Sequence, residues 1–172
     1  MRLIALGLLA TLGTLAHVAN AATITSGVLN VANDQWRYNY TVTNDSLGAD
    51  LAEFAIFFDP TVFTNLSVES SPIGWDLIVV QPDPQLPDDG FLDALALAGG
   101  ITPGGSQGGF SLTFSWLGQS LPGAQPFDVI DPRSFTIIES GLTAVPLPGA
   151  LGLMTLGVLT AMAATRRVLA NT

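Results

Sequence analysis

The side chains in this sequence that could do chemistry are carboxylates, and several of them crowd into one stretch. Residues 81–93 read QPDPQLPDDGFLD and contain Asp83, Asp88, Asp89 and Asp93. Ca²⁺ takes about six to eight oxygen ligands, and the carboxylates and backbone carbonyls of a loop can supply them. The spacing differs from that of an EF-hand loop, which has alternating ligands and a closing Glu. Two interpretations stay open: a calcium site at these aspartates, or a solvated acidic turn without a cofactor, which is the default.

Aromatic side chains form a second candidate group, suited to binding rather than to catalysis. Trp36, Tyr38 and Tyr40 alternate along QWRYNYTVTN, so they share one face of a strand, and Trp75 follows the chain breaker SSP. Rings of this kind can stack on the apolar C–H faces of sugars, which predicts a carbohydrate-binding module. The alternative, which we favour for the stripe, is that it faces the core of the domain. Trp75 lies nearer a loop and is the better candidate for exposure.

Most catalytic side chains are missing from the sequence. It contains no Cys and no Lys, and the only His is His17, which lies in an apolar N-terminal segment. The rest of the chain therefore cannot carry a Ser-His-Asp or Cys-His nucleophile, an imidazole or thiolate zinc site, or a lysine Schiff base. Glycoside hydrolysis needs only two carboxylates about 5–10 Å apart, but with 14 acidic residues such a pair arises by chance. We predict that the protein is not an enzyme and has no catalytic residues; a carboxylate-pair glycoside hydrolase is the remote alternative.

Strands have to position these side chains, because the polarity of the sequence has a period of two. In GFSLTFSWLG, apolar residues at 110, 112, 114 and 116 alternate with serine and threonine, which is the pattern of a half-buried strand. Breakers such as Asn33-Asp34 and Gly104-Gly105 separate the candidates. The expected strands cover residues 23–32, 35–44, 51–58, 63–70, 75–80, 109–118, 127–130 and 135–140, and residues 91–98 fit either a strand or a helical turn. Short strands at this spacing predict an all-β fold with a single antiparallel β-sandwich.

One short motif occurs twice in the chain. FDPTVFT at residues 58–64 resembles IDPRSFT at residues 130–136. An Asp followed by Pro suits the start of a type I turn, where the Asp side chain caps the turn and Pro presets φ. We expect independent turns at Asp59 and Asp131, each leading into a strand.

The N-terminal end of the chain is expected to direct export. Met1-Arg2 is followed by the apolar residues 3–15 and then by Ala19-Asn20-Ala21. A positive start, a short apolar region and a small-x-small tripeptide are typical of a secretory signal peptide. We predict that residues 1–21 form an N-terminal signal helix and that cleavage falls after Ala21.

The C-terminal end contains a short apolar span. Residues 149–165 carry no charge, and their number is 17, which makes a helix of about 26 Å against a bilayer core of about 30 Å. Arg166 and Arg167 can snorkel to the headgroups and would stay on the cytoplasmic side. A core helix is the weaker alternative, since a helix that is apolar all round needs protein on every side. We predict a C-terminal transmembrane helix at residues 149–165.

The same segment carries a family resemblance. Val145-Pro146-Leu147-Pro148, the apolar span and Arg166-Arg167 follow one another in the order of a PEP-CTERM sorting signal, which this tail resembles. Leu147 stands where the name-giving motif has Glu, as in the Val-Pro-Leu-Pro variant of these tails. The resemblance implies an exported protein of a Gram-negative bacterium, with a tail that is processed by a membrane-embedded exosortase. It also implies association with exopolysaccharide or biofilm material.

Residues 22–144 have the size of one domain and are strongly acidic. All 14 acidic residues lie there, against Arg37 and Arg133 alone, for a net charge of −12. Such a surface repels nucleic acid and anionic headgroups. We predict a signal peptide (1–21), an exported β-sandwich domain (22–144) and a sorting tail (145–172), in an inner-membrane-anchored precursor that ends at the cell surface or outside the cell. The expected role is that of a structural or interaction protein of the surface or matrix, and a carbohydrate-binding module is the alternative.

Overall fold

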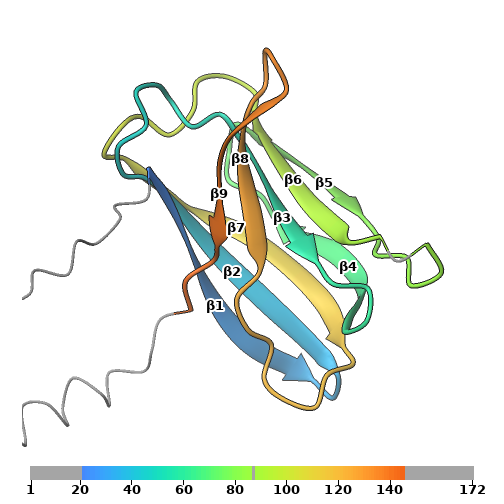
Figure 1. The fold of residues 1–172 in the computed structure, drawn as a ribbon. Coiled ribbons are helices and arrows are strands. Elements are labelled where there is room, and N and C mark those ends of the chain that lie inside the picture. The colour runs from blue at the N-terminus through green and yellow to red at the C-terminus, as the bar shows by residue number, and fades with distance from the viewer. Residues whose placement is uncertain (1–20, 87, 146–172) are drawn as a thin grey trace, which may run out of the picture.

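The computed structural model of the protein describes residues 21–86 and 88–145, which form antiparallel strands in two sheets (Figure 1). The predicted signal helix, the cleavage residue Ala19, the sorting motif beyond Val145 and the predicted transmembrane helix lie outside the described residues. Within the described part of the chain, no helix is long and apolar enough to cross a membrane. The strands are β1 (Ala22–Ala32), β2 (Gln35–Asn44), β3 (Glu53–Phe58), β4 (Phe63–Ser70), β5 (Trp75–Val80), β6 (Gly90–Ala96), β7 (Ser106–Trp116), β8 (Pro126–Asp131) and β9 (Thr136–Leu142).

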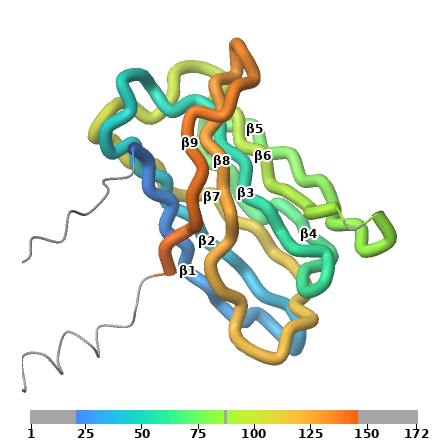
Figure 2. The backbone as a smooth tube through the Cα atoms, in the orientation of Figure 1, coloured from blue at the N-terminus to red at the C-terminus, as the bar shows by residue number. Residues whose placement is uncertain are grey.

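The strands form a β-sandwich, as the alternation of the sequence predicts. One sheet has the order β1-β2-β7-β4, and the other has the order β5-β6-β3-β8-β9. The neighbouring strands in both sheets run antiparallel. Figure 2 follows the chain as it passes between the two layers, for example from β2 to β3 and back to β4. These repeated crossings tie the sheets together, so that neither sheet is a separate unit.

Residues 91–98, which fit a strand or a helical turn by sequence, belong largely to β6. The strand forms because β3 and β5 pair with it on its two sides, and the ladders satisfy backbone groups that a lone helical turn would leave open. The alternation then places Leu92 and Ala94 in the core and Asp93 on the outside. Tertiary pairing therefore decides the conformation of a segment whose own sequence leaves it open.

Aromatic rings from both sheets fill the space between them. Phe54 of β3 and Phe110 of β7 meet edge to face with ring centroids 5.1 Å apart. Phe58 of β3 and Phe63 of β4 do the same at 5.2 Å. Burying a ring of this size stabilises a fold by about 2–3 kcal/mol, and edge-to-face pairs add about 1 kcal/mol. The aromatic core therefore holds the two sheets against each other.

Both Asp-Pro segments cap turns, as predicted. Asp59 Oδ1 accepts hydrogen bonds from Thr61 Oγ1 at 2.7 Å and from Thr61 N at 2.8 Å. Asp131 Oδ1 accepts one from Arg133 N at 2.9 Å. These bonds favour the charged form, so they lower the pKa of both carboxyl groups. The two turns lead into β4 and β9, which begin shortly after them.

The described chain enters and leaves the sandwich on the same side (Figure 1). After β9, Ala144 leaves the five-stranded sheet and joins β1 of the other sheet. Its N–H donates to Ile24 O at 2.8 Å, and its carbonyl accepts from Ser26 N at 2.9 Å. Thr25 and Ala144 thereby form a parallel bridge. The last described residues close the gap between β9 and β1 along one side of the sandwich.

Candidate functional site

The predicted stacking stripe on β2 belongs to the core. Tyr38 and Tyr40 are 0% and 1% exposed, so their rings offer no face to a sugar, and the stacking prediction is wrong for these two residues. The interpretation favoured from the sequence, that this face of the strand points into the core, is confirmed for both residues. Tyr38 stacks on Phe114, with ring centroids 4.8 Å apart. Trp36, on the same side of β2, is partly buried against this core.

The two tyrosine hydroxyls take part in a buried polar network around Gln125. Tyr38 OH donates to the carbonyl of Gly123 at 2.8 Å and accepts from Gln125 Nε2 at 2.6 Å. Tyr40 OH donates to Gln125 Oε1 at 3.3 Å, and Gln125 N donates to Thr143 Oγ1 at 2.9 Å. Burial raises the pKa of both phenols, because it removes water from the charged form. The network joins β2 to the segments that precede β8 and follow β9, and its role is structural.

Trp75 is the predicted aromatic residue that combines a core contact with an accessible side. It begins β5 and is partly buried; its ring meets Phe110 edge to face at 5.1 Å. On another side it lines a hollow of about 180 Å³ together with Thr102, Ser106 and Gln107. An indole beside hydroxyl and amide groups has the chemistry of a small polar binding site.

Three of the four predicted calcium ligands, Asp83, Asp88 and Asp89, line one hollow, and Asp93 lies apart from them on β6. Asp83 and Asp88 face each other across the turn between β5 and β6, where their backbones are joined by hydrogen bonds of 3.1 and 3.2 Å. Asp83 Oδ1 accepts from Gln85 N at 2.8 Å, so this carboxylate caps its own turn. Asp89 is exposed just after the turn, while Asp93 lies in the middle of β6. Among residues 21–86 and 88–145, no group of three His, Cys, Asp or Glu side chains is placed to hold a metal ion.

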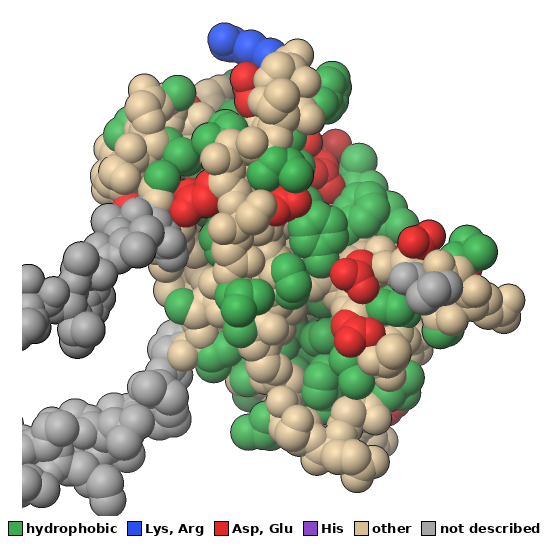
Figure 3. Space-filling model, viewed as in Figure 1, with side chains coloured by type: hydrophobic (Ala, Val, Ile, Leu, Met, Phe, Trp, Pro, Cys, Tyr) green, Lys and Arg blue, Asp and Glu red, His purple; other side chains and the backbone are tan. Residues whose placement is uncertain are grey.

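A mixed apolar and acidic surface covers the outer face of the five-stranded sheet. Asp93, for example, lies between Ile78 of β5 and Ala55 of β3 in the ladder. Figure 3 shows hydrophobic and acidic side chains mixed over the side formed by β8, β3 and β6. We call this surface the carboxylate face; its residues are Glu53, Ala55, Phe57, Asp76, Ile78, Val80, Phe91, Asp93, Leu95, Asp128, Ile130, Ile137, Ser140 and Leu142.

The acids of the carboxylate face have like charges as neighbours. Burial raises the pKa of Glu53, and the nearby charges of Asp93 and Asp131 raise it further. Burial also raises the pKa of Asp93, with a second contribution from Asp76. Within the described residues, the one ion pair joins Arg37 to Glu69 on the other sheet. The carboxylate face therefore holds partly desolvated negative charge among apolar side chains.

Two hollows border one end of the carboxylate face, and Phe57 and Asp89 line both of them. The first has a volume of about 660 Å³ and also includes Phe91 and Leu86. The second has a volume of about 440 Å³ and also includes Trp116. The ring centroids of Phe57 and Phe91 lie 6.4 Å apart, and the two rings form the apolar floor of this end. Aromatic side chains rimmed by carboxylates are therefore accessible here, at an end of the sheet to which the acidic turn also contributes.

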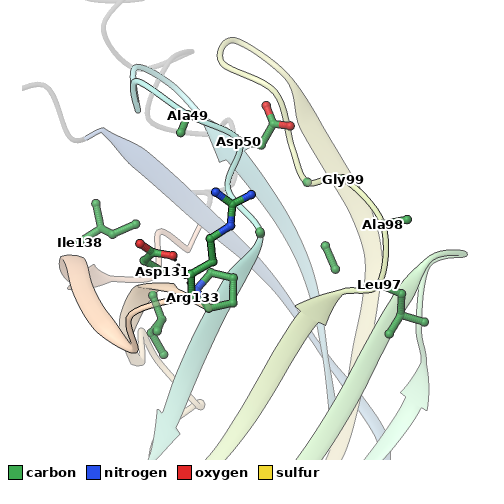
Figure 4. A pocket seen from close by; sticks show the side chains of 13 residues that line it. Ala49, Asp50, Leu97, Ala98, Gly99, Asp131, Arg133 and Ile138 are labelled. Carbon is green, nitrogen blue, oxygen red and sulfur yellow. Dashed lines mark hydrogen bonds between the residues drawn. The ribbon is translucent and has the colours of Figure 1, made fainter.

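The exposed side chain of Arg133 stands at the opposite end of the same sheet. It lies on the turn between β8 and β9 and lines a hollow of about 510 Å³ together with Asp50, Asp131 and Leu97. In Figure 4 its guanidinium extends toward the side chain of Asp50, with Asp131 on its other side. The positive charge contributes to the lowered pKa of Asp131, after the hydrogen bonds of the turn. The charge of Arg133 thus acts on Asp131 of its own turn, and it is not among the causes of the raised pKa values of Glu53 and Asp93.

Comparisons with known proteins give distant structural likenesses. No protein-family model and no curated protein matches the sequence. A cohesin module of a family 33 glycoside hydrolase from Clostridium perfringens matches at TM-score 0.44 with 9% identity, over 74% of this chain and 98% of the module. A chitin-binding domain from Streptomyces coelicolor matches at TM-score 0.39 with 19% identity, over 73% of this chain and 93% of the domain. A GH20 exo-β-N-acetylglucosaminidase from Vibrio harveyi matches at TM-score 0.38 with 12% identity, over 74% of this chain and 18% of the enzyme. Likenesses at this level do not identify a relative.

Sequence reasoning missed the apolar half of the carboxylate face, although the sequence carries a signal for it. EFAIFF in β3 and LIVV in β5 are apolar at nearly every position and do not alternate. Continuous apolar strands are typical of sheets that are covered on both faces. In the described residues, the outer side of this sheet nevertheless leaves Ile78 at 55% exposure. The outer side of this sheet therefore carries apolar side chains that the described residues leave open to solvent.

Proposed function

We propose that this protein is an exported, non-enzymatic interaction protein of the cell surface or extracellular matrix, and that its carboxylate face binds the partner. The observation that carries the proposal is the apolar and acidic composition of that face. Soluble monomers rarely expose large contiguous apolar patches, and those that do usually bind another molecule there. Here the apolar side chains Ile78, Val80 and Leu142 are exposed on the same sheet face as the half-buried acids Glu53 and Asp93, and Ile78 pairs directly with Asp93.

Charge complementarity defines the chemistry of the partner. The exported domain has a net charge of −12 and no Lys, and the acids of the carboxylate face are partly desolvated without cations beside them. A partner with basic groups set among apolar ones would cover the apolar side chains and neutralise the carboxylates together. We therefore propose a basic, partly apolar protein surface of the envelope or matrix as the partner. An acidic exopolysaccharide alone would be repelled.

A pair of lysine substitutions tests the face. Ile78 of β5 and Leu29 of β1 lie on the outer faces of opposite sheets and are 55% and 54% exposed. Ile78→Lys places a cation in the proposed interface, whereas Leu29→Lys makes the same kind of change elsewhere. We expect Ile78→Lys to reduce retention of the exported protein in the cell-surface and matrix fraction by about tenfold or more, and Leu29→Lys to leave retention unchanged. Equal retention of the two variants would contradict the proposal.

We propose that the two ends of the chain direct the export and sorting of the protein. The signal peptide starts export, and the PEP-CTERM-like tail holds the precursor in the inner membrane until an exosortase-type enzyme removes it. Intact-mass analysis of the protein from its native host tests this. We expect a chain that begins at Ala22 and ends near Pro148. A chain that retains Thr172 in the membrane fraction would instead mean a lasting anchor.

Carbohydrate binding is the second candidate, and the hollow beside Trp75 favours it. Thr102, Ser106 and Gln107 give that hollow the hydroxyl and amide groups that hydrogen-bond sugars. Glycan-array binding with and without calcium measures the activity directly. Trp75→Phe keeps an aromatic ring in the core but removes the indole, so it should weaken any glycan binding while Ile78→Lys leaves it intact. Binding that depends on Ile78 and not on Trp75 would move the sugar site to the carboxylate face.

A further inference from the structure

Glu139 is a carboxylate with an incomplete set of partners. It faces inward on β9, the edge strand next to β1, and its Oε1 accepts a hydrogen bond of 3.1 Å from Ala21 N. Its Oε2 is buried and has no hydrogen-bond partner among the described residues. A buried carboxylate oxygen without a donor is costly, because the folded state removes its water and returns nothing. Glu139 Oε2 thus lacks a donor at the point where the chain enters the sandwich.

The two side-chain cations of the exported domain lie away from Glu139. Lys is absent from the sequence, and the domain contains only Arg37 and Arg133 as basic residues. Arg37 Nη2 pairs with Glu69 Oε1 at 2.8 Å on the four-stranded sheet. Arg133 lies on the turn between β8 and β9 and lines a hollow with Asp50 and Asp131. The remaining cation that this chain can form is an α-ammonium group.

The predicted cleavage point lies directly beside Glu139. Ala21 is held in place, because its carbonyl accepts a hydrogen bond of 3.0 Å from Ser46 N while its N–H contacts Glu139. Ala22 begins β1, pairs with Asn44 and is 0% exposed. Hydrolysis of the Ala21–Ala22 peptide bond by water leaves a carboxylate on Ala21 and an amine on Ala22, which takes up a proton at neutral pH. The new charge therefore arises on the residue next to the one that now contacts Glu139, and consecutive Cα atoms lie only about 3.8 Å apart.

We propose that Glu139 binds the α-ammonium group that signal-peptide removal creates at Ala22. The ammonium brings three N–H donors and a positive charge, which replace the single donor lost with Ala21 and supply the partner that Oε2 lacks. The ion pair joins β1 of one sheet to β9 of the other, next to the hydrogen bonds between Ala144 and β1. It forms only in the processed chain, so maturation closes this side of the sandwich. The proposal rests on the proposed export of the protein.

The absence of Lys makes this contact directly measurable. In the mature chain the α-amine is the sole primary amine, since the sequence contains no Lys. An amine-acylating reagent such as sulfo-NHS acetate therefore reports on this one group, and it reacts only with the unprotonated form. A neighbouring carboxylate favours the ammonium, and a shift of one pKa unit lowers the reactive fraction about tenfold.

The experiment compares acylation rates at pH 7 in mature proteins exported by the same host. We expect the wild-type amine to react about tenfold more slowly than the amine of Glu139→Gln, and Glu69→Gln, a matched change on the other sheet, to react like wild type. We also expect the wild-type rate to rise by a similar factor when urea unfolds the protein, which keeps the test valid if Glu139→Gln does not fold.

The outcomes separate the ion pair from the export on which it rests. Intact mass is measured first. A chain that begins at Ala22 but reacts equally fast folded and unfolded, or in wild type and Glu139→Gln, overturns the ion pair and leaves export standing. A chain that still carries residues 1–21 overturns the ion pair together with the signal-peptide assignment.

Discussion

The outer faces of the two sheets differ far more than their inner faces. On the four-stranded sheet, the outward side chains are mainly hydroxyls and amides, such as Asn39, Thr41 and Thr113. On the five-stranded sheet, apolar and acidic side chains alternate, as at Ile78 and Asp93. Inside, both sheets contribute the same kind of large aromatic ring. The fold is therefore specified by the inner faces, and the outer faces are free to differ in composition.

The largest expected effect tests whether the inner faces are equivalent. Phe54→Ala on the five-stranded sheet and Phe110→Ala on the four-stranded sheet each remove a fully buried ring. We expect each to lower the free energy of unfolding by about 3–5 kcal/mol, measured by urea denaturation. The two rings pack against each other with their centroids 5.1 Å apart. The double variant should therefore lose less free energy of unfolding than the sum of the two single losses. A loss from only one of the two substitutions would show that the core depends mainly on the sheet that carries that ring.

The next prediction compares how much side-chain packing on each outer face contributes to stability. Phe57→Ala removes a half-buried ring of the carboxylate face that packs near Phe91. We expect a loss of about 1–2 kcal/mol in the free energy of unfolding. Thr113→Ala, on the outer face of the other sheet, should change it by no more than about 0.5 kcal/mol. Equal values for the two variants would mean that the outer faces do not differ in packing.

A smaller effect is the pH dependence of stability that the acids of the carboxylate face cause. The pKa values of Glu53 and Asp93 are raised above their ordinary values of 4.5 and 3.8, so the folded state holds these protons more tightly than the unfolded state. Their contribution to stability is therefore present at low pH and is lost as the pH rises through the raised values. We expect the melting temperature to increase as the pH falls from 7 toward those values. Below the ordinary value of 3.8 the trend reverses, because the lowered pKa values of Asp59 and Asp131 then cost stability.

Asp93→Asn should remove part of this pH dependence and stabilise the protein at pH 7 by less than about 1 kcal/mol, since the group is only partly desolvated. Asp128→Asn is the control: it makes the same charge change on the same face, at a carboxylate that accepts a hydrogen bond from Ser140 Oγ. It should give no gain. A melting temperature that falls steadily from pH 7 downward in wild type would refute the like-charge description of the carboxylate face.

The smallest effect concerns the ion pair on the four-stranded sheet. Arg37 and Glu69 are both partly exposed to solvent, so their attraction is screened. A double-mutant cycle with Arg37→Ala and Glu69→Ala should give a coupling of no more than about 0.5 kcal/mol, and less at high salt. A coupling well above 1 kcal/mol would contradict the expectation that solvent screens this pair.

The strands could be predicted from the sequence because alternation is a local property. Tyr38 and Tyr40 sit on one face of β2, and Asp59 and Asp131 cap turns, as their neighbours in sequence require. Local alternation does not predict which strands pair with one another. The choice of strand over helical turn for β6 depends on β3 and β5, which flank it in the sheet.

The candidate surface was harder to predict, because it depends on which elements meet in space. Asp83, Asp88 and Asp93 are close in sequence, yet a turn uses the first, and β6 carries the last away along the sheet. Phe57 and Asp89 come together although 32 positions separate them in the sequence. The contact between Ala21 and Glu139 spans almost the whole domain. Only the pairing of β3 with β6 and of Ala144 with β1 brings such groups together.

The bridge between Ala144 and β1 also has a mechanical meaning. In the proposed tethered precursor, tension on the residues that follow Ala144 would act first on the hydrogen bonds of Ala144 to Ile24 and Ser26. These bonds would open one after the other. The pull would then reach Thr143, whose N–H donates to Gln125 O at 2.8 Å. A tethered molecule under load would thus yield at the edge of its buried polar network, while the strands that build the carboxylate face still hold.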